Sequence, residues 1–189
     1  MKRLLAIASM ILLPSLAMAE MTGNPMVMNG DTMQFGEQQV SLYGVHAPMI
    51  TQTCGETDDV WSCGWDAAIH LEDVIAGREV VCTDLTDIGE VGDEGMHYVG
   101  RCTAEGDDLS AAMVEAGFAI PDEEMGEAYV ASAIAAEEEG IGLWSGPFVD
   151  PVTYAQNGGC SCSARKKSMM ENAELLEEMR AEEEATETN

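Results

Sequence analysis

Six cysteines are the residues of this sequence with the most definite chemistry. They are Cys54, Cys63, Cys82, Cys102, Cys160 and Cys162. No two are spaced as Cys-x-x-Cys, and the sequence has no His-x-x-His pair, so it does not indicate a zinc-finger-like site. In a chain exported to an oxidising compartment, an even number of cysteines indicates disulfide bonds.

The N-terminal residues predict such an export. Lys2 and Arg3 precede an apolar run from Leu4 to Leu13, and an Ala-x-Ala site ends at Ala19. This pattern is typical of a signal peptide over residues 1–19, cleaved near Ala19. The run is too short to span a bilayer, although a membrane anchor is the alternative interpretation. No later stretch is long and apolar enough to span, so we expect a periplasmic or secreted protein.

The charge of the remaining chain is strongly negative. All 35 acidic residues but only six of the eight basic ones follow residue 19, so residues 20–189 carry 6 − 35 = −29 charges. A surface of this charge repels polyanions, which argues against a nucleic acid as partner. A salt-adapted or solubilising surface explains the charge, and a cationic partner is the alternative.

The pattern of apolar residues and turn residues predicts a small α+β domain. The predicted strands are two or three over 26–45, one over 79–85 and one over 96–103, with a loop over 87–95. The predicted helices are 63–77, 108–116 and 124–139, and we expect Pro147 and Pro151 to prevent any further helix. Five strands with a helix inserted after the third favour a small barrel.

Residues 156–189 form a separate C-terminal segment. Four residues fall at helical spacing, namely Met169, Ala173, Leu176 and Arg180. The segment is basic at its start and acidic at its end, which opposes the helix dipole, so we expect a marginal helix and partial disorder. A helix that docks on a protein partner is the alternative.

Short motifs in fixed order give the chain a resemblance to the staphylococcal nuclease (thermonuclease-like) family. They are 29–32, 40–48, 52–54, 63–64, 77–82, 101–102, 106–109, 113–119 and 142–148. The resemblance covers roughly residues 26–155 and implies a five-stranded OB-fold-like barrel with about three packed helices. We therefore expect a nuclease-like domain over residues 20–155.

The resemblance implies calcium-dependent hydrolysis of phosphodiesters in DNA and RNA. This reaction needs carboxylates for the cation, a base for the water and two cationic donors for the phosphate. Asp31 matches a calcium-binding aspartate. However, Ser41 stands where the first phosphate-binding arginine belongs, His46 where a second calcium-binding aspartate belongs, and Met49 where the glutamate base belongs.

The position of the second arginine depends on the register of the strand. Counting back from Cys102 places His97 there, whereas a one-residue insertion would offer Arg101 instead. We favour His97, because this register leaves the strand and Cys102 in place. With the first arginine and the base replaced in either register, we predict no confident catalytic residue.

Three functions follow from these replacements. The first is an exported, catalytically degenerate nuclease-like domain that acts as a binding or scaffold protein. The second is a weak calcium-dependent endonuclease. The third is a periplasmic protein that binds zinc or copper through Asp31, His46 and His97, with Met49 nearby, because imidazole and thioether suit these metals better than calcium. An inert polar cavity is the alternative to a metal site.

The predicted strands also suggest how the cysteines pair. Cys82 and Cys102 lie on strands that we expect to be neighbours, which predicts a cross-strand disulfide. Cys54 and Cys63 would close a short loop before the first helix.

The remaining Cys160 and Cys162 form a Cys-x-Cys pair, which is strained if bonded to itself. A labile disulfide, a soft-metal ligand pair, an intermolecular link and a structural bond in a loop all stay open for this pair.

Overall fold

The computed structural model describes residues 20–56, 58–91 and 95–158. The predicted signal peptide over 1–19, most of the C-terminal segment, and both Cys160 and Cys162 lie outside these residues. Within them, no helix has the length and apolar character needed to cross a membrane.

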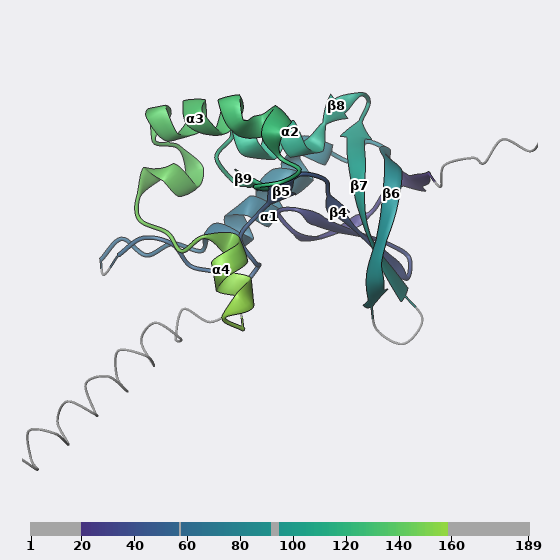
Figure 1. The fold of residues 1–189 in the computed structure, drawn as a ribbon, viewed down its shortest axis with the longest axis horizontal. Helices are drawn as coiled ribbons and strands as arrows, with labels where there is room; N and C mark the ends of the chain where they lie inside the picture. Colours follow the sequence, from purple (N-terminus) through teal and green to yellow (C-terminus); the bar gives the residue numbers. More distant parts are fainter. Residues whose placement is uncertain (1–19, 57, 92–94, 159–189) are drawn as a thin grey trace, which may run out of the picture.

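A mixed, strongly curved sheet forms the framework of the domain (Figure 1). Its strands are β1 (Met21–Gly23), β2 (Met26–Asn29), β3 (Thr32–Phe35), β4 (Gln38–Leu42), β6 (Val80–Val91), β7 (Gly95–Ala104) and β8 (Asp107–Asp108). The order is β1-β6-β7-β4-β3-β2, with β8 paired to β7. Only the β4–β7 pair is parallel among the paired strands of the described sheet. A second small sheet pairs β5 (Val45–His46) with β9 (Ile120–Pro121).

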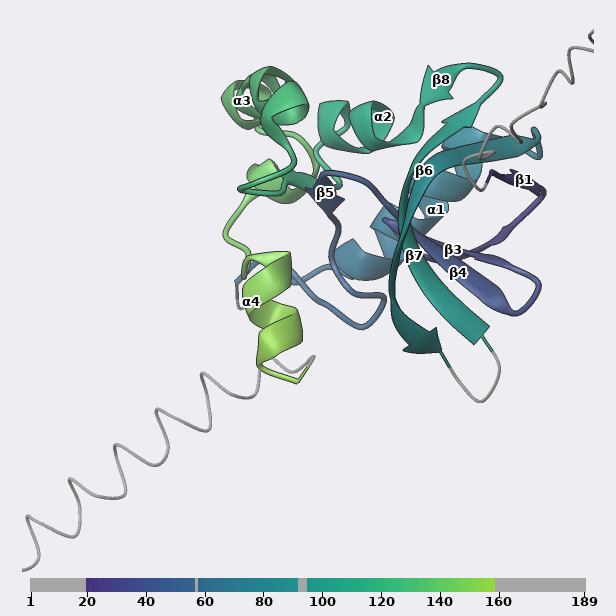
Figure 2. The same ribbon diagram turned by 45° about the vertical axis from the view of Figure 1, so that its right-hand side comes forward.

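The helices cover the sheet and its open end. They are α1 (Cys63–Ile75), α2 (Leu109–Glu115), the 3-10 turn η1 (Glu127–Tyr129), α3 (Val130–Glu139), a second 3-10 turn η2 (Gly142–Ser145) and α4 (Pro151–Gln156). In Figure 2 the strands curl around α1, while α3 and α4 lie on opposite sides of β5. This is the predicted OB-fold-like α+β class, seen as a half-barrel with packed helices.

The core lies between the curved sheet and α1. Side chains with no exposed surface meet there from both layers, including Met33, Val40, Leu71, Val80 and Met113. Their alternation along the strands and their three- and four-residue spacing along the helices produce one apolar face per element. The same packing requires Gly30 in the β2–β3 turn, because a Cβ atom there would lie only 2.7 Å from the Ala67 Cβ of α1.

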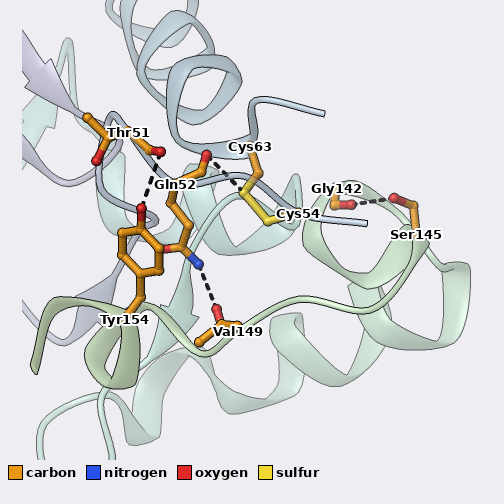
Figure 3. The surroundings of a disulfide bond; sticks show 8 residues. All are labelled: Thr51, Gln52, Cys54, Cys63, Gly142, Ser145, Val149 and Tyr154. Carbon is orange, nitrogen blue, oxygen red and sulfur yellow. Dashed lines mark hydrogen bonds between the residues drawn. A yellow bond between two sulfur atoms is a disulfide. The ribbon is translucent and has the colours of Figure 1, made fainter. Parts of the chain in front are cut away.

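Both predicted disulfides are present. Cys82 on β6 lies directly opposite Cys102 on β7, and the two are bonded. Cys54 is bonded to Cys63 at the start of α1, beside the segment that leads into α4 (Figure 3).

Two sequence-based predictions were wrong. The predicted loop over 87–95 is instead largely strand: β6 continues to Val91, β7 begins at Gly95, and the two arms pair with each other. Its glycines and acidic residues suggested a loop, but register shifts absorb positive φ angles at Asp84 and Gly89.

Pro151 does not prevent a further helix, because it opens α4. It occupies the first turn, where a missing N–H costs nothing, and the Asp150 carboxylate caps the helix by accepting from the Thr153 N–H at 2.9 Å.

Candidate functional site

Asp31 lies in the turn between β2 and β3, at the end of the half-barrel. One carboxylate oxygen accepts a hydrogen bond from the Thr32 hydroxyl at 2.9 Å, and the other accepts from the backbone N–H of Ala47 at 2.8 Å. Burial raises the pKa of the Asp31 carboxyl group above its ordinary 3.8, although both hydrogen bonds oppose this shift. Both oxygens are therefore engaged by the protein itself.

A chain of hydrogen bonds runs from Asp31 across three strands to His97. The Thr32 and Ser41 hydroxyl oxygens are 2.9 Å apart, and Ser41 Oγ is 2.9 Å from His97 Nε2. The register explains this contact: Thr32 on β3 faces Ser41 on β4, and β4 runs parallel to β7, which carries His97.

The direction of the protons in this chain follows from the number of donors. Thr32 has a single hydroxyl proton and donates it to Asp31, so Ser41 must donate to Thr32. Ser41 then has only lone pairs left for His97, so His97 Nε2 is the donor in this hydrogen bond. Hydrogen bonds thus link the four side chains in one row.

His46 on β5 takes part in a different interaction. Its Nε2 atom lies 2.8 Å from a carboxylate oxygen of Asp122, just after β9, and both residues line an acidic cavity of about 600 Å³. The backbone N–H of Met125 is the main cause that lowers the pKa of Asp122 below its usual 3.8, and His46 and the Glu124 N–H add to it.

Among the described residues, neither Met49 nor an arginine hydrogen-bonds to Asp31, Thr32, Ser41 or His97. Met49 is 37% exposed. Arg78 donates to the Asp107 carboxylate at 2.7 Å and to backbone carbonyls at the end of α1. Arg101 stacks on the ring of Tyr43 at 4.1 Å and lies 3.7 Å from Asp84. These are the two Lys or Arg residues between positions 20 and 158, and neither contacts Asp31 or His97.

The donor set around Asp31 does not fit calcium. A hard cation takes roughly six to eight oxygen ligands. Both oxygens of Asp31 already accept hydrogen bonds, and positions 46 and 49, which the resemblance relates to a second calcium ligand and the base, hold an imidazole and a thioether. No group of three or more His, Cys, Asp or Glu side chains suited to a metal occurs in residues 20–56, 58–91 and 95–158. The zinc or copper site at Asp31, His46 and His97 stays a prediction.

A family model described as staphylococcal nuclease homologue matches residues 39–146. The chain belongs to this family. The matched span contains Ser41, His46, Met49 and His97, and Asp31 lies just before it. The succinoglycan biosynthesis protein ExoI of Rhizobium meliloti (strain 1021) is 26% identical over 125 residues. The alignment covers 65% of this chain and 63% of ExoI, so the chain matches less than two thirds of that relative.

Two residues that contact the predicted site residues were not predicted from the sequence, namely Thr32, which contacts Asp31, and Asp122, which contacts His46. Thr32 stands in the 29–32 motif beside Asp31, so its adjacency to a site carboxylate could have indicated a role. Asp122 has no such signal, because it is 76 positions from His46 and is brought there only by the β5–β9 pairing.

Proposed function

We propose that this protein is a catalytically silent member of the staphylococcal nuclease homologue family that acts as a binding or scaffold domain outside the cytoplasm. The observation that carries this proposal is the row of hydrogen bonds that runs from His97 through Ser41 and Thr32 to Asp31. The positions that resemble cation and phosphate sites hold polar side chains that bind one another.

The energetics of phosphodiester hydrolysis support this proposal. The developing charge on the phosphate needs preorganised cationic donors, and a serine hydroxyl supplies neither the charge nor the fork of a guanidinium group. Losing one such donor typically costs ~10²–10³ in rate, and losing a general base costs a further ~10²–10⁴. Because such losses are not additive, we expect activity at least ~10³-fold below that of an intact family member.

Two further observations support a role other than nucleic-acid cleavage in an exported protein. Residues 20–189 carry −29 charges, which oppose the approach of a polyanion. The two disulfides suit an oxidising compartment, as does the N-terminal pattern near Ala19. In addition, the relative ExoI is named for succinoglycan biosynthesis, which is consistent with a role other than nucleic-acid degradation.

A nuclease assay on the oxidised residues 20–189 tests the proposal. With added calcium we expect no cleavage of DNA or RNA above the level of the Asp31→Ala variant. The matched control is Asp59→Ala, which removes an exposed carboxylate elsewhere. Calcium-dependent cleavage that Asp31→Ala abolishes and Asp59→Ala keeps would overturn the proposal and establish the weak endonuclease instead.

The metal content of the same sample tests the third function. Zinc or copper that co-purifies in a one-to-one ratio and is lost in both His46→Ala and His97→Ala would establish the predicted transition-metal site. Such a result would replace the scaffold proposal with a metal-binding function.

A further inference from the structure

An apolar groove lies between the edge strand β2 and the outer face of α1. It has a volume of about 250 Å³ and is lined mainly by Met26, Met28, Ile50, Trp65 and Ile69. Met26 is 65% exposed and Trp65 is 56% exposed. A second hollow of about 260 Å³ shares Val27 and Glu72 with the first, so the groove continues toward the end of α1.

The pattern of residues presents this face to the outside. Met26 and Met28 alternate along β2, and Trp65, Ile69 and Glu72 follow one another at helical spacing on α1. Exposed apolar side chains gathered on one surface mark an interaction site, and methionines suit it because their flexible side chains adapt to a partner. The groove is therefore a candidate docking site for another segment of protein.

The C-terminal segment of this chain has the matching composition. Met169, Ala173 and Leu176 lie at spacings of four and three, which place them on one side of a helix. Just before them stand Arg165, Lys166 and Lys167, three of the six basic residues that follow position 19. An otherwise strongly acidic chain thus carries its basic cluster beside an apolar stripe.

The charges around the groove complement this cluster. Glu72 lines the groove and is exposed, and Asp73 beside it on α1 is exposed as well. A basic segment placed along the C-terminal half of α1 would also suit the negative end of the helix dipole.

A residue of the last described helix contacts the segment next to the groove. Tyr154 of α4 donates its hydroxyl proton to the carbonyl of Thr51 at 3.3 Å, and Thr51 follows Ile50, which lines the groove (Figure 3). From Gly158 to Met169 the chain has eleven steps, which can span roughly 35 Å when extended. The free-energy cost of closing a loop grows only slowly with its length, so a linker of this length is compatible with docking.

We infer that residues 165–176 of this chain dock in the groove between β2 and α1 of the same molecule. The apolar stripe of Met169, Ala173 and Leu176 covers Met26 and Trp65, and the basic cluster lies near Glu72 and Asp73. This inference is independent of the proposed function, because it involves no residue of the Asp31 chain.

Oxidation of individual methionines tests the docking. Residues 20–189 are exposed to dilute peroxide, and the oxidation rates of Met26 and Met28 are followed by mass spectrometry of peptides. The Met169→Glu/Leu176→Glu variant adds two charges to the stripe and should weaken its docking. We expect peroxide to oxidise Met26 at least ~5-fold faster in this variant than in the unchanged protein, because the side chain is then exposed to solvent. Met125, 41% exposed on another surface, provides the internal reference.

The matched control is Ala185→Glu/Thr186→Glu, which adds the same two charges beyond the stripe. In this control, Met26 should be oxidised at the same rate as in the unchanged protein. For each protein, the Met26 rate should be the same at protein concentrations of about 1 and 100 μM, because the contact is intramolecular. Equal Met26 rates in the stripe variant and the unchanged protein would overturn the inference and leave the groove to a separate partner. Protection that disappears on dilution would also overturn it, in favour of a second copy of the chain.

Discussion

Asp31 has the hydrogen-bond partners of a structural carboxylate. Thr32 and the Ala47 amide use its two oxygens, and Ser41 extends the contact to His97. Partly buried polar side chains linked in this way stabilise one another only while each has its partner. We therefore expect the residues at this site to contribute to stability. The effect of a substitution here on the free energy of unfolding can be measured whether or not the protein has an activity.

The first prediction concerns the pH dependence of stability at Asp31. Burial raises its pKa in the folded state, so the folded protein binds this proton more tightly than the unfolded chain does. The contribution of Asp31 is thus fully present below 3.8 and declines as the pH rises through the raised folded value. A tenfold difference in proton affinity between the folded and unfolded states corresponds to about 1.4 kcal/mol of stability.

We expect Asp31→Asn to remove this decline, so the variant gains stability relative to the unchanged protein as the pH rises from 3.5 to 7. Urea unfolding at several pH values measures the difference. Asp59→Asn, an exposed carboxylate, should show no such trend, and a flat difference for Asp31→Asn would contradict the assigned burial effect.

The second prediction concerns Asp122, whose shift has the opposite sign. Its pKa is lowered by the Met125 N–H and by His46, so its contribution is present above 3.8 and is lost as the pH falls through the lower folded value. Replacing it by alanine removes acceptors for Glu124 and Met125 and the link to His46.

We expect Asp122→Ala to cost about 1–3 kcal/mol at pH 7 and much less near pH 2. Chemical denaturation at the two pH values measures this cost. His46→Ala is the companion variant, which keeps both backbone contacts and should cost less. An equal cost for Asp122→Ala at both pH values would show that its carboxylate charge is not involved.

At the scale of elements, α4 depends on one cap. The Asp150 side chain accepts from the Thr153 N–H, and the helix is then fastened by Tyr154 to Thr51 and by the Gln52 amide to the Val149 carbonyl (Figure 3). The third prediction is that Asp150→Ala destabilises the domain by about 1 kcal/mol, whereas Asp150→Asn, which can still cap, costs only a few tenths. Thermal unfolding of both variants distinguishes the effect of losing the cap from the effect of losing the charge.

The long β6–β7 hairpin depends on its disulfide. Cys82 and Cys102 join its arms across 20 residues of chain. The fourth prediction is that Cys82→Ala/Cys102→Ala lowers the free energy of unfolding by about 3 kcal/mol, mainly because the unfolded chain regains freedom. Cys54→Ala/Cys63→Ala, which opens a separation of 9, should cost somewhat less. Denaturant titrations compare the two, and the reverse order would contradict the loop-length argument.

At the scale of the whole molecule, repulsion among carboxylates opposes folding. With −29 charges on residues 20–189, salt screens far more repulsion than attraction. The fifth prediction is that raising NaCl from 0.05 to 0.5 M stabilises the protein by about 1 kcal/mol, or roughly 4 °C in Tm, at pH 7.

Calorimetry at two pH values tests the cause. Near pH 4, close to the pI of about 4.1 of the full sequence, the same change in NaCl should have much less effect because far fewer net charges remain on residues 20–189. An equal effect at both pH values would attribute the stabilisation to something other than screening.

The sequence by itself determined much of this protein. Alternating apolar residues and turn glycines predicted the strands from Met26 to Leu42, helical spacing predicted α1, and the motifs indicated the family. The same motifs predict that Ser41 and Met49 stand where the resemblance places a phosphate-binding arginine and the glutamate base. These are local properties, because each depends on residue types within a few positions of one another.

Only the tertiary structure decided what the replaced residues contact. The parallel pairing of β4 with β7 brings Ser41 to His97 across 56 positions, and the β5–β9 pairing brings His46 to Asp122. It also made strands of residues 87–91, where local preference suggested a loop. In each case the outcome depends on free energy gained from residues distant in sequence, which no local pattern contains.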